Sequence, residues 1–390
     1  MNIIVAPDSF KGSLTAAQAA DAIVQGVRHV LPDAEIVSIP LADGGEGTVD
    51  ALVFATRGRI LRQKATGPLG EPVEAFFGML GDDLTGVVEM AAAAGLSLAP
   101  PEKRDPLAAT TYGVGQLILA ALEAGCKRLI VGLGGSATSD GGAGMAQALG
   151  VRLLDKDGAD LPRGAAPLVG LERIDLSRRD PRLEQVTIYA ASDVSNPLCG
   201  PRGAAAIYGP QKGASPEAVE TLDRALARLA EVIERDLKLE VRNLAGAGAA
   251  GGLGAGLVAF CGAELRSGPN LVLELLRFEE YLEAADLVLT GEGKVDRQIE
   301  FGKAISGVAL LAQRYEVPII AFTGNLAEEP EKLAERGLAA AIPISPGPMA
   351  EEEAMARAGE LLQAAAERTM QLLLLGRSLG EGRWIAPPQQ

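Results

Sequence analysis

Seven loops, six of them rich in glycine, contain most of the residues in this chain that could do chemistry. Five combine glycine with Asp, Glu, Ser, Thr or Lys, one has Asp and Ser without glycine, and one has glycine and apolar residues alone; most follow an apolar run typical of a β-strand. Glycine lets the backbone approach a phosphate closely, and the N–H groups that open the next helix point at it. We therefore expect a small-molecule site at the ends of parallel strands. The loops span residues 8–13, 43–48, 132–145, 192–198, 209–214, 245–256 and 289–303.

The two N-terminal loops bring carboxylates next to glycines. In the first, Asp8 and Ser9 precede Lys11, whose ammonium group could pair with a phosphate or carboxylate. In the second, Asp43 and Glu46 lie among three glycines and could hold Mg²⁺ or bind substrate hydroxyls. For both loops the structural alternative is a capped turn between a strand and a helix.

The sequence GLGGSATSDGGAGM at residues 132–145 is the most distinctive of the seven. A purely structural turn does not need so many hydroxyl groups and glycines together. The sequence predicts a site for a phosphate or a small hydroxy acid here. The candidate binding residues are Gly134, Gly135, Ser136, Thr138, Ser139 and Asp140.

The loops at 192–198 and 209–214 each contribute one charged candidate. Asp193 ends a predicted strand, and the following Asn196-Pro197 forces a turn. Asp193 could be a base or a metal ligand, with an Asx-turn as the structural alternative. Lys212 is the only charged residue in the second loop.

The last two loops allow more than one interpretation. Residues 246–251 match G-x-G-x-x-G, but no convincing strand precedes them, so close helix packing or a nucleotide loop through Gly251 and Gly252 fits better than a dinucleotide fingerprint. Near residue 290, Glu292, Lys294 and Asp296 are crowded after a predicted strand. A solvated charged loop is the alternative there. The chain has neither GxxxxGK[ST] nor the HRD and DFG sequences of protein kinases.

Composition limits the partners, the cellular compartment and the proton-transfer groups that we expect for this protein. The net charge of −15 disfavours nucleic acid and anionic membranes as partners. Three widely separated cysteines suit a reducing cytoplasm, and the N-terminus is expected to be a first strand, not a signal peptide. No stretch approaches the roughly 20 apolar residues that span a bilayer. With a single histidine, His29, proton transfer is expected to use a carboxylate or a lysine.

Alternating strand and helix patterns predict an α/β protein with a parallel sheet covered by helices. Thr15 and Gln18 predict a capping box at the start of a helix, and Ser215 is the predicted cap of the clearest helix. Residues 58–92 change to a hairpin-like pattern, which suggests an inserted second domain. We expect one domain from residues 1–62 and 283–376, a second from 63–282, and a loose tail at 377–390.

Taken together, the loops resemble the bacterial glycerate kinase family, the type that forms 2-phosphoglycerate. The matching stretches run in the family's order and cover nearly the whole chain. Two small departures are Ser192, where Cys is expected, and Ser195, where Thr is usual. The stretches are APDSFKGSL, PLADGGEGT, ATTYGVGQLI, GLGGSATSDGGAGM, SDVSNPL, GPQKGA, GAAGGLGAGL and LTGEGKVDRQ.

The resemblance implies two α/β domains, one Rossmann-like, with the active site in the cleft between them. It implies ATP as phosphate donor, Mg²⁺, and D-glycerate as acceptor. On this hypothesis Asp193 is the base and Lys11 stabilises the transferred phosphoryl group, while Glu292 or Asp296 helps to hold Mg²⁺. Asp8, Ser9 and Asp43 orient glycerate, the 134–140 loop binds glycerate or phosphate oxygens, and Lys212, Gly251, Gly252 and Lys294 contact the nucleotide.

Two other classes of function stay open at this point. The Gly246–Gly251 loop would serve an NAD-dependent oxidoreductase acting on a small hydroxy acid. A non-enzymatic metabolite-binding regulator would need a DNA-binding helix or an effector partner, and no basic recognition helix is visible in the sequence. The protein is expected to be a monomer or a homodimer.

Overall fold

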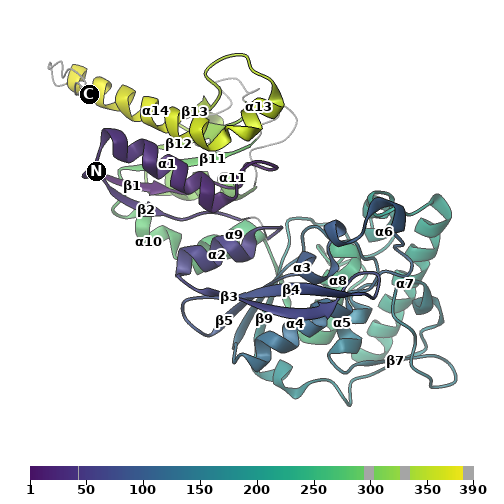
Figure 1. Ribbon diagram of the computed structural model, residues 1–390. Helices are drawn as coiled ribbons and strands as arrows, with labels where there is room; N and C mark the ends of the chain where they lie inside the picture. The colour runs from purple at the N-terminus through teal and green to yellow at the C-terminus, as the bar shows by residue number, and fades with distance from the viewer. Residues whose placement is uncertain (43, 294–302, 326–333, 381–390) are drawn as a thin grey trace. The chain divides into compact units, whose positions relative to one another are not determined.

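The computed structural model describes residues 1–42, 44–293, 303–325 and 334–380 (Figure 1). The chain divides into two compact units. Unit 1 comprises Met1–Ala42 and Val272–Gln390, and unit 2 comprises Asp43–Leu271. These units divide at residues 42 and 272, whereas the boundaries expected from the sequence were 62 and 283. Residues 48–62 fall in unit 2 because the helix and strand that they form pack against the strands that follow them.

The sheet of unit 1 has five parallel strands in the order β13-β12-β11-β1-β2. Buried aliphatic residues dominate the three central strands, as expected for a parallel sheet covered on both faces. The strands are β1 (Asn2–Val5), β2 (Glu35–Ser38), β11 (Leu287–Glu292), β12 (Ile319–Thr323) and β13 (Ala340–Pro343).

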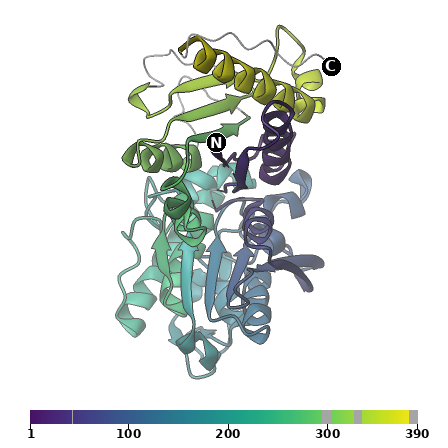
Figure 2. The same cartoon turned by 90° about the vertical axis from the view of Figure 1, so that its left-hand side faces the viewer.

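One face of this sheet is covered by α1 (Ala16–Val30) and α14 (Ala358–Gly380), which lie side by side in Figures 1 and 2. Gly26 permits their close approach, because a Cβ atom there would lie 2.8 Å from the Cβ of Ala366. The predicted capping box of Thr15 and Gln18 is present at the start of α1. The other helices of this part of the chain are α9 (Gly268–Leu275), α10 (Phe278–Leu282), α11 (Lys303–Arg314) and α13 (Glu351–Ala356).

The C-terminal helix differs from the sequence prediction in two ways. The sequence of residues 350–374 predicts a single helix, but α13 ends at Ala356 and α14 begins at Ala358. Arg357 between them has non-helical angles, φ −106° and ψ 12°. The loose tail predicted from residue 377 is wrong for residues 377–380, which continue α14. Residues 381–390 lie outside the described part of the chain.

Unit 2 contains a mixed sheet in the order β10-β9-β6-β5-β4-β3. The first four strands in this order are parallel, and β3, β4 and β5 form the antiparallel meander that the 58–92 pattern predicts. Its strands are β3 (Arg59–Thr66), β4 (Pro72–Met79), β5 (Thr85–Glu89), β6 (Arg128–Gly132), β9 (Thr187–Ala191) and β10 (Glu264–Arg266). A separate hairpin pairs β7 (Arg152–Leu154) with β8 (Arg173–Asp175).

The core of unit 2 joins the sheet to helices on both sides of it, and alanine, leucine and valine dominate this core. The predicted cap Ser215 accepts a hydrogen bond from the N–H of Ala218 at the start of α7. The helices are α2 (Thr48–Thr56), α3 (Ala91–Ala94), α4 (Tyr112–Glu123), α5 (Ala143–Ala148), α6 (Ala204–Tyr208), α7 (Pro216–Leu237) and α8 (Ala249–Cys261), with short 3₁₀ turns at 96–98, 101–103, 166–170, 181–185 and 210–212.

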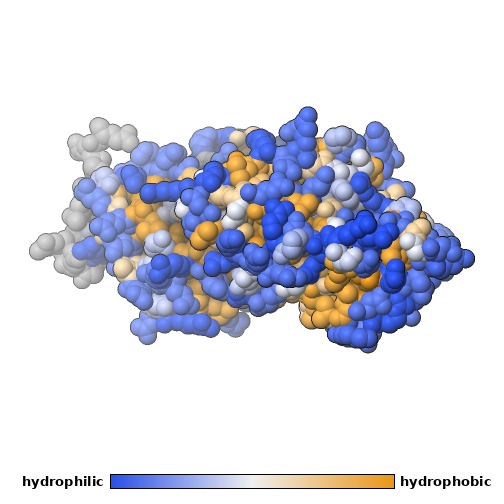
Figure 3. Space-filling view, turned by 90° about the horizontal axis from the view of Figure 1, so that it is seen from below, coloured by the Kyte–Doolittle hydropathy of each residue, from blue (hydrophilic) through white to orange (hydrophobic). Residues whose placement is uncertain are grey.

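The face shown in Figure 3 is mostly hydrophilic, with apolar groups between the charged ones, as is usual for protein surfaces. Among the residues described, no helix combines the length and the apolar composition needed to cross a membrane.

Candidate active site

The loop after β1 is fixed mainly by its own backbone. The N–H of Asp8 donates to the carbonyl of Gly291 over 2.8 Å, and the Asp8 carboxylate accepts from the N–H of Ser9 over 2.6 Å. Phe10 is buried and pairs with Leu14 in a short bridge, which closes the loop. This closure leaves Lys11 exposed at the tip of the loop, while Asp8 and Ser9 are half-buried.

The loop after β11 lies directly against this first loop. Gly293 makes the approach possible, because a Cβ atom there would lie 3.1 Å from the backbone nitrogen of Lys11. Glu292, immediately before it, is half-buried. Strand order reverses between β1 and β11, since β2 extends the sheet on one side and β12 and β13 on the other. Open α/β sheets bind ligands at this kind of switch point.

The structure thus brings Asp8, Ser9, Lys11 and Glu292 together at the carboxyl edge of unit 1. Three other predicted site residues, Asp43, Lys294 and Asp296, lie outside the described residues. Within the described ranges no group of three or more His, Cys, Asp or Glu side chains is arranged to hold a metal ion. Mg²⁺ is commonly held by one or two carboxylates together with substrate phosphates, and Asp8 and Glu292 are donors of that kind.

In unit 2, the loop at residues 44–48 lies on the carboxyl ends of the central strands. A Cβ atom on Gly132 would come within 2.5 Å of the Gly44 carbonyl oxygen, and one on Gly134 within 2.5 Å of the Cα of Gly45. Gly44 in turn lies close to Ala191 at the end of β9. Gly132 and Gly134 are therefore required for close packing against the 44–48 loop.

Glu89 is the site residue that the sequence prediction missed. It ends β5, is 4% exposed, and accepts a hydrogen bond of 2.7 Å from the N–H of Val49 at the start of α2. Burial raises the pKa of the Glu89 carboxyl to about 7, although the N–H groups of Val49 and Gly47 oppose that shift. The available signal was a single carboxylate at the end of the apolar run GVVE.

Asp140 organises the 132–145 loop from inside. Its carboxylate accepts hydrogen bonds from the N–H groups of Thr111, Gly142 and Gly144 at 2.8 to 3.1 Å, and from the Thr111 hydroxyl. It has no exposed surface, and burial raises the pKa of its carboxyl. The hydroxyl of Thr111 also accepts from the N–H of Met145 in α5. Asp140 therefore joins the starts of α4 and α5 beneath the loop.

Lys212 is likewise buried, with 1% of its surface exposed. Its Nζ donates to the Ser136 hydroxyl over 2.8 Å and to the Thr138 carbonyl over 2.6 Å. Burial lowers the pKa of Lys212 to about 7, and nearby Asp140 opposes that shift. Lys212 thus holds the 134–140 loop in place through hydrogen bonds to two of its residues.

The hydroxyls of Thr138 and Ser139 are the groups of this loop that stay available. Both side chains are buried, and neither hydroxyl oxygen has a hydrogen-bond partner among the described residues. Buried polar atoms without partners are uncommon, and a ligand or a water molecule usually satisfies them.

Gly251 and Gly252 are buried against the backbone of residues 138–142. A Cβ atom on Gly251 would lie 2.6 Å from the Cα of Ser139, and the N–H of Gly141 donates to the carbonyl of Gly251. Residues 250–252 adopt left-handed angles, and no strand leads into them. The Gly246–Gly251 match is therefore not the strand–turn–helix of a dinucleotide-binding fold, and close packing accounts for it.

Asp193 follows β9 at the same edge of the sheet and is half-buried. The turn after it is held by Asn196, whose side chain donates to the Arg202 carbonyl and accepts from the Tyr208 hydroxyl over 2.7 Å. In unit 2 the carboxyl edge therefore gathers the 44–48 loop, Glu89, the 134–140 loop and Asp193.

A family model described as the glycerate kinase family matches residues 3–374. The chain belongs to the glycerate kinase family. It is 49% identical to a glycerate kinase of Bacillus subtilis over 97% of this chain and 99% of that protein. It is also 49% identical to a glycerate 2-kinase of Escherichia coli, over 88% of this chain and 90% of the relative.

The fold agrees with this membership. A crystal structure from Salmonella typhimurium LT2, provisionally described as glycerate kinase 2, superposes with a TM-score of 0.90. It is 49% identical and covers 97% of this chain and 99% of its own. The α/β fold and the family predicted from the sequence are thus confirmed. The individual residue roles and the predicted cleft between the domains stay predictions.

Proposed function

We propose that this glycerate kinase family member transfers the γ-phosphoryl group of ATP to D-glycerate, giving 2-phosphoglycerate and ADP. The observation that supports it most is the near-half identity, over almost the whole chain, to relatives that are glycerate kinases. The structure supports it too, because the described loops at 8–13, 44–48, 134–140 and 192–198, which carry much of the resemblance, lie at the carboxyl ends of parallel strands in the two units.

In this reaction the C2 hydroxyl oxygen of glycerate attacks the γ-phosphorus of ATP. The bond between that phosphorus and the β–γ bridging oxygen breaks, and ADP leaves. We assign the hydroxyl proton to the carboxylate of Asp193, because the only histidine, His29, is exposed on α1 and pairs with Glu367. We assign to Lys11 the stabilisation of negative charge on the transferred phosphoryl group, since its side chain is exposed at a loop tip.

Magnesium is proposed at the carboxyl edge of unit 1, where Glu292 would be a ligand and Asp8 lies in the neighbouring loop. Asp296, which is outside the described residues, is the other proposed ligand. When bound, Mg²⁺ neutralises the charge that builds up on the phosphate oxygens. Glu292 contributes a half-buried carboxylate at the strand switch point. Lys294 is proposed to contact the nucleotide phosphates nearby.

Binding of the glycerate substrate is assigned to hydroxyl and backbone groups. We propose that Thr138 and Ser139 bind glycerate oxygens, because their hydroxyls are the unpartnered polar groups of the loop. Gly134, Gly135 and Ser136 shape the same loop, and Asp8, Ser9 and Asp43 remain the proposed orienting residues. Asp140 and Lys212 are instead proposed to position this loop, because neither has more than 1% of its surface exposed.

The alternative of an NAD-dependent oxidoreductase loses its main support, because residues 246–251 are packing glycines. A thermal-shift series separates the alternatives. ATP with Mg²⁺ and D-glycerate should together raise the melting temperature, whereas NAD should leave it unchanged. Initial rates of ADP release with D- and L-glycerate then give the stereochemical preference. Stabilisation by NAD without ADP release would contradict the proposal.

A further inference from the structure

The N-terminus of α2 is already filled by the protein's own carboxylate. A nine-residue helix that follows a glycine-rich loop would normally offer its first N–H groups to a phosphate. Here the first turn points at Glu89, whose carboxylate accepts from the N–H groups of Val49 and Gly47. The Glu89 carboxylate therefore occupies the position at which the N-terminus of α2 would otherwise bind an anion.

The chain places this carboxylate in an unusual way. A Ser, Thr or Asp at the N-cap is the common means of satisfying the first turn. The N-cap here is Gly47, with φ 91°, and it makes no side-chain hydrogen bond. Glu89 instead reaches the helix from the end of β5, where it is paired in register with Gly132. It therefore links the 44–48 loop to the strand that leads into the 132–140 loop.

A carboxylate buried to this degree is costly, so a role in packing alone does not account for it. An apolar side chain could fill the same volume without desolvating a charge. The hydroxyl of Thr48 donates to the Gly45 carbonyl over 2.7 Å, which ties the loop to the helix locally. Glu89 adds a connection between the loop and the sheet, which the local bond cannot supply.

We propose that Glu89 is a positioning residue that fixes the 44–48 loop on the strand ends and leaves its outer face for the hydroxyl groups of the substrate. This inference rests on the proposed function for the identity of the substrate, but its structural part does not. With the helix N-terminus occupied, phosphate and carboxylate groups must be bound by other parts of the protein.

Other charged groups near Glu89 are few. Glu46 in the loop and Asp50 in α2 both act to keep it protonated. Of the elements that contact β5, α3 carries no charged residue and β4 carries the exposed Glu74. Arg128 of β6 is paired with Thr85, at the opposite end of β5. Burial therefore places the pKa of Glu89 close to neutral pH, and by pH 8 its carboxyl is mostly charged.

Glu89→Gln tests the inference because Gln keeps the shape and removes the charge. At pH 8 we expect the KM for D-glycerate to rise about tenfold or more, with the KM for ATP changed less than about twofold. Glu89→Asp, which keeps the charge on a shorter side chain, should restore part of the affinity.

Hydrogen exchange provides a readout that does not depend on the reaction. Amides 47–51 should be protected in the wild type at pH 8 and lose protection in Glu89→Gln and Glu89→Ala, while amides in β6 and β9 keep theirs. Formate, used as a carboxylate probe, should restore protection in Glu89→Ala. Glu74→Gln on β4 is the matched control, because it removes an exposed carboxylate of the same unit.

Unchanged protection and unchanged glycerate KM in Glu89→Gln would overturn the inference. Loss of protection throughout unit 2 would also overturn it, since Glu89 would then serve overall stability only. If the wild type does not phosphorylate D-glycerate at all, the proposed function fails, and the exchange and formate results still decide the role of Glu89.

Discussion

The two units present chemically different carboxyl edges. In unit 1, Lys11 is exposed at a loop tip, and Asp8 and Glu292 are half-buried beside it. In unit 2, Glu89, Asp140 and Lys212 are all 4% exposed or less, and each holds a loop from within. Charged groups near a sheet edge can therefore act on a ligand or on the protein's own backbone, and burial distinguishes the two uses.

Asp193 differs from the buried charged groups at the carboxyl edge of unit 2, because it is only half-buried where it follows β9. Asp193→Asn should lower kcat by about a thousandfold, the middle of the range for loss of a general base. Steady-state kinetics at saturating ATP measure the effect, and circular dichroism confirms that the variant is folded. Turnover close to the wild-type rate would remove Asp193 from the mechanism.

The two lysines, Lys11 and Lys212, form a matched pair for the comparison. Lys11→Met should reduce kcat by about a hundredfold or more and leave the free energy of unfolding within about 0.5 kcal/mol, because an exposed charge is lost. Lys212→Met should instead destabilise unit 2 by about 2 kcal/mol, since Ser136 and the Thr138 carbonyl lose a buried partner.

Urea unfolding and initial-rate kinetics on both variants measure these effects. If Lys212→Met abolished turnover without any loss of stability, Lys212 would be a ligand-binding group and the proposed distinction would fail.

The buried groups also predict an unusual pH dependence of stability. The pKa of Glu89 is raised to about 7, so the folded state binds its proton more tightly, and stability falls as the pH rises from about 4.5 to 7. The pKa of Lys212 is lowered to about 7, so its contribution makes stability rise from about pH 7 to 10.5. Each slope is at most about 1.4 kcal/mol per pH unit.

Unfolding free energies across this range should lose the lower slope in Glu89→Gln and the upper slope in Lys212→Met. Identical pH profiles in wild type and both variants would show that neither group is perturbed by burial.

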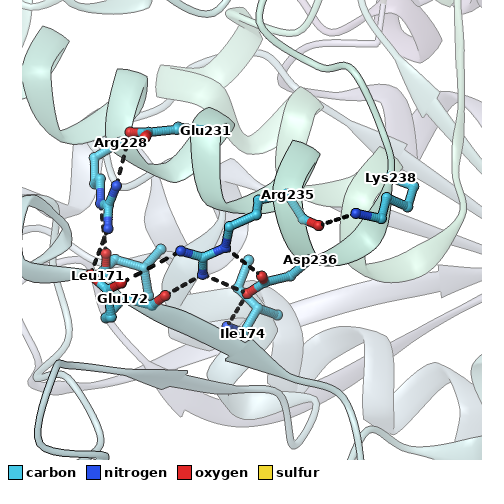
Figure 4. Close-up of polar contacts among 8 residues, drawn as sticks. All are labelled: Leu171, Glu172, Ile174, Arg228, Glu231, Arg235, Asp236 and Lys238. Atoms are coloured by element: carbon cyan, nitrogen blue, oxygen red, sulfur yellow. Dashed lines mark hydrogen bonds and ion pairs between the residues drawn. The ribbon is translucent and has the colours of Figure 1, made fainter.

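The smallest effect is expected for the surface network around α7 and β8 shown in Figure 4. Arg235 pairs with Glu172 and Asp236, and the Asp236 carboxylate accepts from the N–H of Ile174. Arg235 is 46% exposed, so Arg235→Ala should change the unfolding free energy by less than about 1 kcal/mol. Turnover should be unchanged, and a tenfold loss of kcat would show that charges outside the two carboxyl edges also matter.

The sequence was most informative where local patterns decide structure. The capping box at Thr15, the Ser215 cap and the hairpin-like strands of 58–92 all depend on neighbouring residues, and all are present. The glycine-rich loops were also predictable, because clusters of glycine directly after apolar runs are typical of tight turns at strand ends. The break at Arg357 was not predicted, because Gly359 is the only poor helix former near it and an isolated glycine inside a helical pattern is often tolerated.

What the sequence could not indicate was which polar residues are buried. Asp140 and Lys212 look like ligand-binding residues in a one-dimensional pattern, and in the structure both are buried and hydrogen-bonded to the protein's own backbone. Glu89 was missed because its partners, Gly47 and Val49, lie 40 or more positions away and meet it only when α2 packs on β5. Burial of this kind depends on tertiary packing, which periodicity does not encode.

Identification of the reaction product tests the central claim most directly. The purified protein is incubated with ATP, Mg²⁺ and D-glycerate labelled with carbon-13, and the product is assigned by carbon and phosphorus NMR. We expect one ADP for each phosphorylated glycerate, with the phosphate bonded to the C2 oxygen. No phosphorylated glycerate, or phosphate bonded to the C3 oxygen, would contradict the proposal.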